Sequence, residues 1–511
     1  MTETLIVHGR WLITGAGADD PTLENGAVAV QDGEIQSVAR LARLREQYPG
    51  ARELGGAGMA IMPGLINAHH HSHGASNFQH GIADRLLESW LIGLGAKRPG
   101  DNYLEALLSA GELLRSGVTS VVDVISGGGL TAPVLDNACR QTLEGYAKAG
   151  IRMALAPGIS DRNRLLWADD QEAAFIASLP STVQPLAEAR LPGKDATTPD
   201  EYLALVRALH RDYRNHPRID IWFGPPGPGW VSDGFLERIA EAAGELETRI
   251  QTHALESFYE NLHGRRLYGQ PTLLHLRDLG LLNPRFSIAH GVWLSEAEIQ
   301  ALADSGAAVS HNPSSNLRLR AGVAPLQELL MAGVTVGLGM DGTTLNDDED
   351  MFTELRLALR LAGGPRYEDG IPDTGAVFAL ATDGGARLMG QSRLGRLAPG
   401  YRADLLLLDL SRICWPWVAP EADPQELLLM RARRDDVDTV LVDGQVVVAG
   451  GEPTSFDRHT AGEELARRMA STPRPAELAL QLGSLLAPVE DFYRSWEVGE
   501  LHPYRIFNSR R

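Results

Sequence analysis

The sequence contains little cysteine, an excess of acidic over basic residues, and no long hydrophobic run. Two cysteines among 511 residues, Cys139 and Cys414, exclude a disulfide framework and a cysteine-based zinc site, and they favour a reducing compartment. A net charge of −19 argues against nucleic-acid or anionic-membrane partners. No apolar run reaches the ~18 residues of a membrane span. The first residues, MTETLIVHGRW, lack the features of a signal peptide. We therefore expect a cytoplasmic protein.

The two ends of the chain both have the pattern of short strands. Residues 1–60 contain TLIVHGRWLI, GAVAVQ and EIQSVA with Asn25-Gly26 and Asp32-Gly33 as hairpin signals, and RADLLLLDL and DTVLVDGQVVVAGG return near the other end. Neither set is large enough for a stable sheet alone. We expect one small β-sandwich built from residues 1–60 and 393–455, followed by a C-terminal extension over 456–511.

Residues 61–392 alternate instead between apolar, strand-like runs and helical stretches. The expected strands end near His69–His71, Asp123, Pro157, Pro225, His253, His290, His311 and Asp341, and helices such as DNYLEALLSAGELLRSG follow them. Eight such units predict an α/β fold, a closed (β/α)8 TIM-like barrel. An open doubly wound sheet would carry a glycine-rich phosphate loop after its first strand, and none is present.

Candidate metal ligands gather at the predicted strand ends, where barrels place their active sites. His69 and His71 lie two apart at the end of PGLINAHHH, so both face one side of a strand. His253 and Asp341 end two later strands, and three imidazoles with one carboxylate suit zinc or iron. The region after the fourth strand, IWFGPPGPGW, has no lysine that could bridge two metals, so we expect one divalent metal, zinc or alternatively iron.

Other residues have plain structural interpretations beside the functional ones. His70 should face away from the pocket, and His73 should be a loop residue. Glu256, three residues after His253, could carry protons between water and substrate, or could start a helix as a favourable acid. His290 could orient the attacking water or be a hydrogen-bonded core histidine, and Asp341 could both ligate and accept a proton.

The motifs PGLINAHHH, HALE, AHG, SHNPSSN and GLGMDGTTLNDDEDMFTELRLA occur in the order seen in the amidohydrolase superfamily. They resemble the branch of cytosine, guanine and S-adenosylhomocysteine deaminases and s-triazine hydrolases. The resemblance implies a barrel with a flanking β-sandwich. It implies metal ligands at His69, His71, His253 and Asp341, a proton-shuttling Glu256, and a catalytic His290. It also suggests substrate contacts from Gln79, Trp90, His311 and Asn316.

The sequence departs from this branch at two places, Gly-Pro-Pro-Gly after the fourth strand and Leu345 in place of a serine. Our leading hypothesis is a metal-dependent hydrolytic deaminase of an aminated N-heterocycle of the pyrimidine, purine, pterin or s-triazine type. The alternatives are removal of a halide or alkylamine from such a ring, opening of its cyclic amide, and a non-catalytic scaffold.

Aromatic residues near the C-terminus, Phe492, Tyr493, Trp496 and Tyr504, should pack on the same chain or on a partner subunit. We expect a homo-oligomer (dimer or tetramer).

Overall fold

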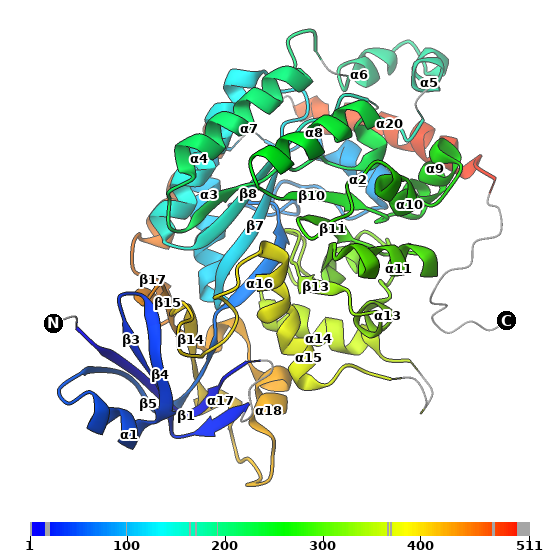
Figure 1. Ribbon diagram of the computed structural model, residues 1–511. Helices are drawn as coiled ribbons and strands as arrows, with labels where there is room; N and C mark the ends of the chain where they lie inside the picture. Colours follow the sequence, from blue (N-terminus) through cyan, green and yellow to red (C-terminus); the bar gives the residue numbers. More distant parts are fainter. Residues whose placement is uncertain are drawn as a thin grey trace.

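Strands from both ends of the chain form one nine-stranded sheet beside a barrel (Figure 1). The computed structural model describes residues 3–15, 21–98, 100–162, 165–168, 171–191, 193–364, 367, 370–472 and 476–497, with only the backbone for 476–480. The sheet has the order β17-β16-β15-β14-β5-β1-β3-β4, and β2 pairs with β1. Its strands are β1 (Leu5–Ile13), β2 (Thr22–Glu24), β3 (Gly26–Gln31), β4 (Glu34–Arg40), β5 (Arg52–Pro63), β14 (Leu405–Asp409), β15 (Val437–Val442), β16 (Gln445–Ala449) and β17 (Glu452–Pro453).

The pairing of β5 with β14 joins the two chain ends. These strands run antiparallel, with Pro63 opposite Leu405 and Met59 opposite Asp409. The predicted hairpin at Asp32-Gly33 forms, and both residues have positive φ (49° and 78°), as a type I′ turn requires. The expectation that both ends build one β-unit is confirmed. The predicted domain limit between residues 60 and 61 falls inside β5. The second half of that strand pairs with β14, so it belongs to the same sheet as the first half.

Eight parallel strands form the barrel, in two hydrogen-bonded sets of four. A bridge between Phe223 and Ile250 joins the sets on one side. On the other side His69 O accepts the N–H groups of Met340 and Asp341. The strands are β6 (Leu65–His70), β7 (Val118–Ser126), β8 (Arg152–Gly158), β9 (Ile219–Ile221), β10 (Ile250–Ala254), β11 (Phe286–His290), β12 (Ala308–His311) and β13 (Thr335–Leu338). β6, β8 and β11 are buried along their whole length, as strands covered on both faces are. The predicted barrel is confirmed.

Helices surround the barrel and follow its strands (Figure 1). Asp101 caps α3, as its side chain accepts from Leu104 N. Ser232 occupies the N-cap position of α8, but its hydroxyl donates to Asp161 instead of capping. The helices of the barrel region are α2 (Leu87–Leu94), α3 (Asn102–Arg115), α4 (Ala132–Ala149), α5 (Glu172–Ser178), α6 (Gln184–Glu188), α7 (Pro199–Tyr213), α8 (Asp233–Glu245), α9 (Phe258–Tyr268), α10 (Thr272–Asp278), α11 (Glu296–Ser305), α12 (Pro313–Arg318), α13 (Leu326–Met331), α14 (Met351–Ala362), α15 (Thr374–Leu380) and α16 (Asp383–Met389).

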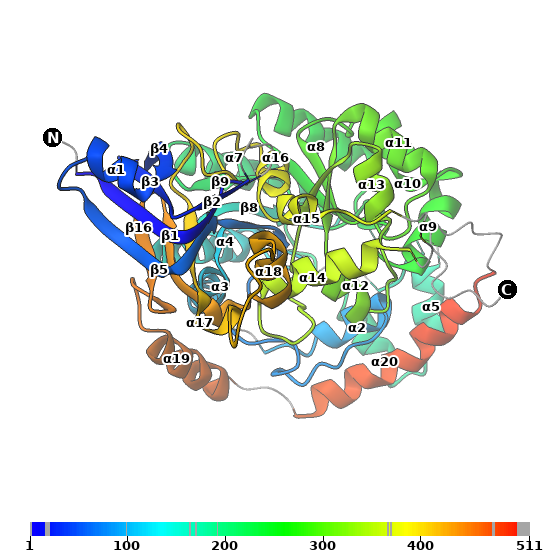
Figure 2. The same ribbon diagram turned by 90° about the horizontal axis from the view of Figure 1, so that it is seen from below.

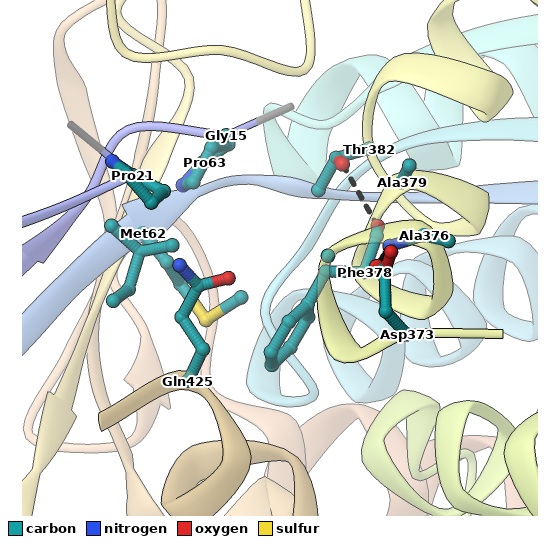
Figure 3. A pocket seen from close by; sticks show the side chains of 12 residues that line it. Gly15, Pro21, Met62, Pro63, Asp373, Ala376, Phe378, Ala379, Thr382 and Gln425 are labelled. Atoms are coloured by element: carbon teal, nitrogen blue, oxygen red, sulfur yellow. Dashed lines mark hydrogen bonds between the residues drawn. The ribbon is translucent and has the colours of Figure 1, made fainter. Parts of the chain in front are cut away.

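The β-unit carries short helices of its own, and a cavity lies where it meets the barrel. These helices are α1 (Leu41–Gln47), α17 (Leu410–Ile413) and α18 (Pro424–Arg431). Met62 of β5, Phe378 of α15 and Gln425 of α18 line the cavity of 290 Å³ (Figure 3). Gly15 and Pro21 also line it and flank residues outside the described part of the chain.

The C-terminal extension docks on its own chain. It contains α19 (Arg458–Ser471) and α20 (Ala476–Arg494), and α20 lies against α2 (Figure 2). Tyr493 is 4% exposed, and its hydroxyl accepts from Trp167 N at 2.8 Å. Phe492 and Trp496 pack in the same cluster, whereas Tyr504 lies outside the described residues. Of the two expectations for these aromatics, packing on the same chain holds. Within the described ranges, no helix has both the length and the apolar character needed to cross a membrane.

Candidate metal centre and active site

Four of the predicted residues meet at the carboxyl ends of three barrel strands. His69 lies in β6 and His71 follows it, His253 lies in β10, and Asp341 follows β13. One atom from each of the four side chains lies within 4.8 Å of the others. Asp341 Oδ1 is 3.0 Å from His69 Nε2 and 3.3 Å from His71 Nε2. The Nε2 atoms of His71 and His253 are 3.1 Å apart. His70, between the first two, turns away and contacts Ser109 of α3.

Hydrogen bonds fix the tautomer of each histidine in this cluster. His71 Nδ1 donates to Val124 O and His253 Nδ1 donates to Pro226 O, both at 2.8 Å. His69 Nδ1 donates to Gln251 Oε1, because the amide nitrogen of Gln251 is used on Ala68 O. In the neutral rings every Nε2 therefore turns a lone pair toward the same point. Pro226 belongs to the Gly-Pro-Pro-Gly segment in which the sequence departs from its relatives, so this departure still supplies an acceptor for His253.

This donor set fits a divalent metal. Two nitrogen lone pairs 3.1 Å apart repel one another unless a cation or a proton lies between them. Tetrahedral zinc with bonds of about 2.0–2.1 Å places its ligand atoms about 3.3 Å apart, close to the distances found here. Burial, with the neighbouring imidazoles of His69 and His71, holds the pKa of His253 well below its usual value. Burial alone would raise the pKa of Asp341, but the imidazoles of His69 and His71 beside it hold that pKa well below its usual range. Neutral imidazoles and an ionised carboxylate are the forms that bind metal.

Glu256 and His290 form a second group that shares Asp341 with the first. His290 Nε2 is 3.4 Å from Glu256 Oε2 and 4.0 Å from Asp341 Oδ2. His290 Nδ1 is held by Asn316 Oδ1 at 3.0 Å. Burial lowers the pKa of His290 to about 4, so its ring is neutral. Burial raises the pKa of Glu256 well above its usual value, and the carboxyls of Asp341, Glu260 and Glu88 add to this effect. A buried carboxyl of this kind beside a metal-type cluster can carry protons.

The plain interpretation of Glu256 as a helix-starting acid does not match the structure. Helix α9 begins after its N-cap, Ser257, whose hydroxyl accepts from Glu260 N in a capping box. Glu256 precedes this cap, and its side chain is 4% exposed at the floor of a cavity. Glu260 holds it in place, since the carboxylate of Glu260 accepts from the N–H groups of Leu255 and Glu256.

A cavity of 290 Å³ opens above these groups. Trp90 lines it, and Trp90 Nε1 is buried without a hydrogen-bond partner among the described residues. Gln79 does not line it, because the side chain is exposed and its oxygen accepts from Ser76 N. Asn316 is 1% exposed and contacts His290, and His311 is 1% exposed at the end of β12; neither lines the cavity. The structure thus brings only Trp90 of the four predicted substrate contacts to the cavity.

Several residues that sequence reasoning missed complete the site. The cavity walls are mostly apolar and come from α2, the loop after β9 and α12: Leu87, Leu91, Leu94, Trp230 and Leu319. Ser315 donates to Asp341 Oδ2 at 2.5 Å. It belongs to the SHNPSSN motif, which the sequence shows, but the sequence does not indicate its contact with Asp341. Gln251 lies two residues before His253, the same spacing as His69 and His71, and this spacing could have predicted that it faces the centre. Leu345, the other departure, is 44% exposed and lies outside the cavity lining.

Comparison with known proteins agrees with this geometry. The model of the amidohydrolase family matches residues 60–447. The chain belongs to the amidohydrolase family. It is therefore a metal-dependent hydrolase of C–N bonds other than peptide bonds, which confirms the class predicted from the motifs.

Three relatives illustrate the branch. The 5-methylthioadenosine/S-adenosylhomocysteine deaminase of Nitratidesulfovibrio vulgaris (strain Miyazaki F) is 33% identical over 441 residues, 85% of this chain and 90% of that protein. The 5'-deoxyadenosine deaminase of Methanothermobacter thermautotrophicus is 31% identical over 458 residues, 88% of this chain and 94% of that one. The crystal structure of an adenosine deaminase from Xanthomonas campestris with bound zinc superimposes with a TM-score of 0.76 at 28% identity, covering 91% of this chain and 98% of that one.

Proposed function

We propose that this amidohydrolase is a metal-dependent deaminase that hydrolyses the exocyclic C–N bond of an aminated N-heterocycle. The observation that carries the proposal is the contact of Glu256 with His290 beside the three-histidine, one-aspartate cluster, at the floor of a cavity with apolar walls. The named relatives, which are deaminases of adenosine-type compounds, favour an aminated purine over the other rings.

In this proposal His69, His71, His253 and Asp341 hold one divalent metal, with zinc favoured over iron because a related structure contains zinc. When bound, such a metal supplies Lewis acidity and lowers the pKa of a water. The carbonyl and amide acceptors behind the histidines keep the rings oriented and basic. Ser315 fixes the carboxylate of Asp341 in a similar way.

The proton chemistry falls to Glu256, His290 and Asp341. Asp341 and Glu256 both line the cavity, and their carboxyls can exchange protons with a water held there. Glu256 carries the first water proton to the ring nitrogen next to the carbon that is attacked, and it then carries the remaining hydroxyl proton to the leaving amine. His290 Nδ1 donates to Asn316, so the Nε2 atom of the neutral ring presents a lone pair that keeps Glu256 in place and can orient the attacking water.

The mostly apolar walls of the cavity support a flat ring as substrate, and the one lysine in its lining, Lys97, is paired with Glu105. Its volume of 290 Å³ is near the lower end of ligand pockets, which suits a bicyclic ring. Trp90 offers an aromatic surface, and Leu91 and Leu319 add apolar wall. Arg318, which could have met an anionic group, is instead paired with Asp84 and Asp347.

Ammonia release tests the proposal. The zinc-loaded enzyme is screened with adenine nucleosides, aminopyrimidines, aminopterins and amino- or halo-s-triazines, with His253→Ala as the matched inactive control. Release of ammonia from one ring class supports the proposal. Release of halide or alkylamine without ammonia, or ring opening, replaces it by the alternative chemistry at the same residues. Absence of any turnover in the metal-loaded protein favours the non-catalytic scaffold.

Three further assignments complete the proposal. We propose domain limits at 1–60, 61–392, 393–455 and 456–511, of which the first lies three residues before the end of β5. We also propose a cytoplasmic location, in keeping with the two free cysteines, and a homo-oligomeric state. The side chains of Trp415 and Trp417, 72% and 73% exposed between α17 and α18, support an oligomer because large exposed apolar groups mark contact surfaces. Light scattering measures its size.

A further inference from the structure

A second cluster of potential ligands lies at the carboxyl end of β6, beside the catalytic cavity, which His73 also lines. His70, His73 and Glu349 each offer one atom, and these atoms lie within 4.8 Å of one another. His73 Nε2 is 3.4 Å from Glu349 Oε1, and His70 Nδ1 is 4.0 Å from Glu349 Oε2. The side chains are 0%, 13% and 12% exposed for His70, His73 and Glu349. None of the three belongs to the cluster of His69, His71, His253 and Asp341, so the two groups share no ligand.

The hydrogen bonds of this cluster leave His73 Nε2 as an acceptor that faces the carboxyl of Glu349. His73 Nδ1 lies 3.0 Å from His71 O, a carbonyl that only accepts, so Nδ1 carries the hydrogen. In the neutral ring, His73 Nε2 therefore turns a lone pair toward the carboxylate of Glu349. His70 Nε2 is occupied by Ser109 Oγ at 3.0 Å. His70 Nδ1 and Glu349 Oε2 are buried and have no hydrogen-bond partner among the described residues. Such an arrangement is costly unless a cation or a proton joins the facing atoms.

The loop that supplies Glu349 is held in an unusual conformation. Asp347 and Glu349 have φ values of 61° and 52°, a region that residues other than glycine rarely adopt. Thr344 Oγ1 fixes the backbone by accepting from the N–H groups of Asp348 and Glu349. The strained backbone turns the Glu349 side chain inward, toward the two histidines, although an acidic side chain in a surface loop is better solvated outside.

We propose that His70, His73 and Glu349 form a second, separate site for a divalent transition metal such as zinc. Two imidazoles and one carboxylate are a known zinc donor set, and the observed separations need only a small closure to reach the about 3.3 Å between ligands of a tetrahedral ion. The site joins the end of β6 and the loop after it, which supply His70 and His73, to the loop after β13, which supplies Glu349. It is a structural clamp across two of the strand ends that carry the catalytic centre. His73 also lines the catalytic cavity, but none of the three residues has a role in the proposed proton transfers.

Metal counting on defined variants tests the second site. Wild-type protein, Glu349→Gln, His73→Gln and His253→Ala are stripped with a chelator, reloaded with Zn²⁺ and desalted, and zinc per chain is measured by elemental analysis. Glu354→Gln serves as the matched control, because Glu354 is a buried glutamate of the neighbouring helix α14 that contacts Ser314 and belongs to neither cluster. Crystals of the zinc-loaded wild type, measured at the zinc absorption edge, locate each ion independently of any substitution.

The expected result is about two zinc ions per chain in wild type and Glu354→Gln, and about one in Glu349→Gln and in His73→Gln. An anomalous peak should lie between His70 and Glu349. A wild type with one ion, a peak only at His253, or variants of Glu349 and His73 that keep the wild-type zinc content would each overturn the proposal. The two zinc sites are tested independently. Loss of zinc in His253→Ala concerns the catalytic centre alone, whereas Glu349→Gln and His73→Gln test the second site.

Discussion

Replacement of Glu256 by glutamine isolates proton transfer from every other role of this side chain. Glutamine has nearly the same shape as glutamate, and it can still contact His290 Nε2, which lies 3.4 Å from the carboxyl. It cannot accept and return a proton. The backbone should stay in place, because the N–H of Glu256 is held by Glu260, which the substitution leaves intact. The substitution also removes a buried ionisable carboxyl from beside Asp341, so the free energy of unfolding should not decrease.

The size of the expected effect follows from the position of the carboxyl. Glu256 is the one protonatable group in the described cavity that contacts His290 and lies next to Asp341 without being assigned as a ligand. General acid–base catalysis contributes about 10²–10⁴-fold, or about 2.7–5.5 kcal/mol of activation free energy. We therefore expect kcat of Glu256→Gln to fall at least about a hundredfold. KM should change little, since the cavity walls come from other residues.

The assay compares zinc content, KM and kcat of wild type, Glu256→Gln and Glu298→Gln. Glu298 is a matched control: it is 0% exposed, and its carboxylate accepts from Ser295 and Leu273 outside the cavity lining. Glu298→Gln should lower stability by about 1 kcal/mol through its lost acceptor and leave kcat within a few-fold. A zinc-loaded Glu256→Gln enzyme with near-normal kcat would remove Glu256 from the mechanism. A variant that has lost its zinc would instead show that Glu256 is itself a ligand.

Four further outcomes are expected. His253→Ala should lose the catalytic zinc and most activity, and calorimetry should show the loss of ligand stabilisation, about 2.7 kcal/mol when free metal is 100 times its Kd. Deletion of residues 1–55 should expose the apolar partners of β1 and β5 and cause aggregation in sedimentation assays; a soluble, active truncation would contradict this. Truncation after Thr472 removes α20 from α2, the helix that carries Trp90, and should raise KM more than it lowers kcat. Burial raises the pKa of Glu354 from 4.5 to about 8, so between these values the folded state holds a proton that the unfolded state releases. The free energy of unfolding should therefore fall as pH rises from 4.5 to about 8. Chemical denaturation of Glu354→Gln should show a weaker dependence of this free energy on pH.

The fold was predictable because its signals are local. Each barrel strand is a short apolar run followed by a helical stretch, and the turns at Asp32-Gly33 and Asp443-Gly444 are encoded in adjacent residues with positive φ. The position of α20 was not predictable. Its aromatic residues could equally have packed on another subunit, and the choice depends on partners such as Trp167 and Tyr259, which are distant in sequence.

In the candidate site, the metal ligands were predictable from the sequence and the substrate contacts were not. The cluster of His69, His71, His253 and Asp341 follows from one rule, that ligands gather at the carboxyl ends of parallel strands. Substrate contacts follow no such rule, because they depend on loop conformation. Gln79 folds back onto Ser76 and leaves the cavity to the apolar face of α2. Asn316, expected at the substrate, is used to hold His290.

Backbone strain at three strand ends explains why these side chains converge at all. Leu255, His290 and Asp341 have φ values of 55°, 76° and 57°, which cost about 1–3 kcal/mol each in residues other than glycine. A strand that simply continued would alternate its side chains between the barrel interior and the helices. The left-handed residue ends that alternation, so that Glu256, His290 and Asp341 turn toward the strand ends of β6 and β10. The surrounding hydrogen bonds hold this conformation: Gly291 N donates to Ala254 O, and Asp341 N donates to His69 O. A glycine at position 290 or 341 would relieve the strain but remove the reacting group, so stability is given up at the residues on which the proposed chemistry depends.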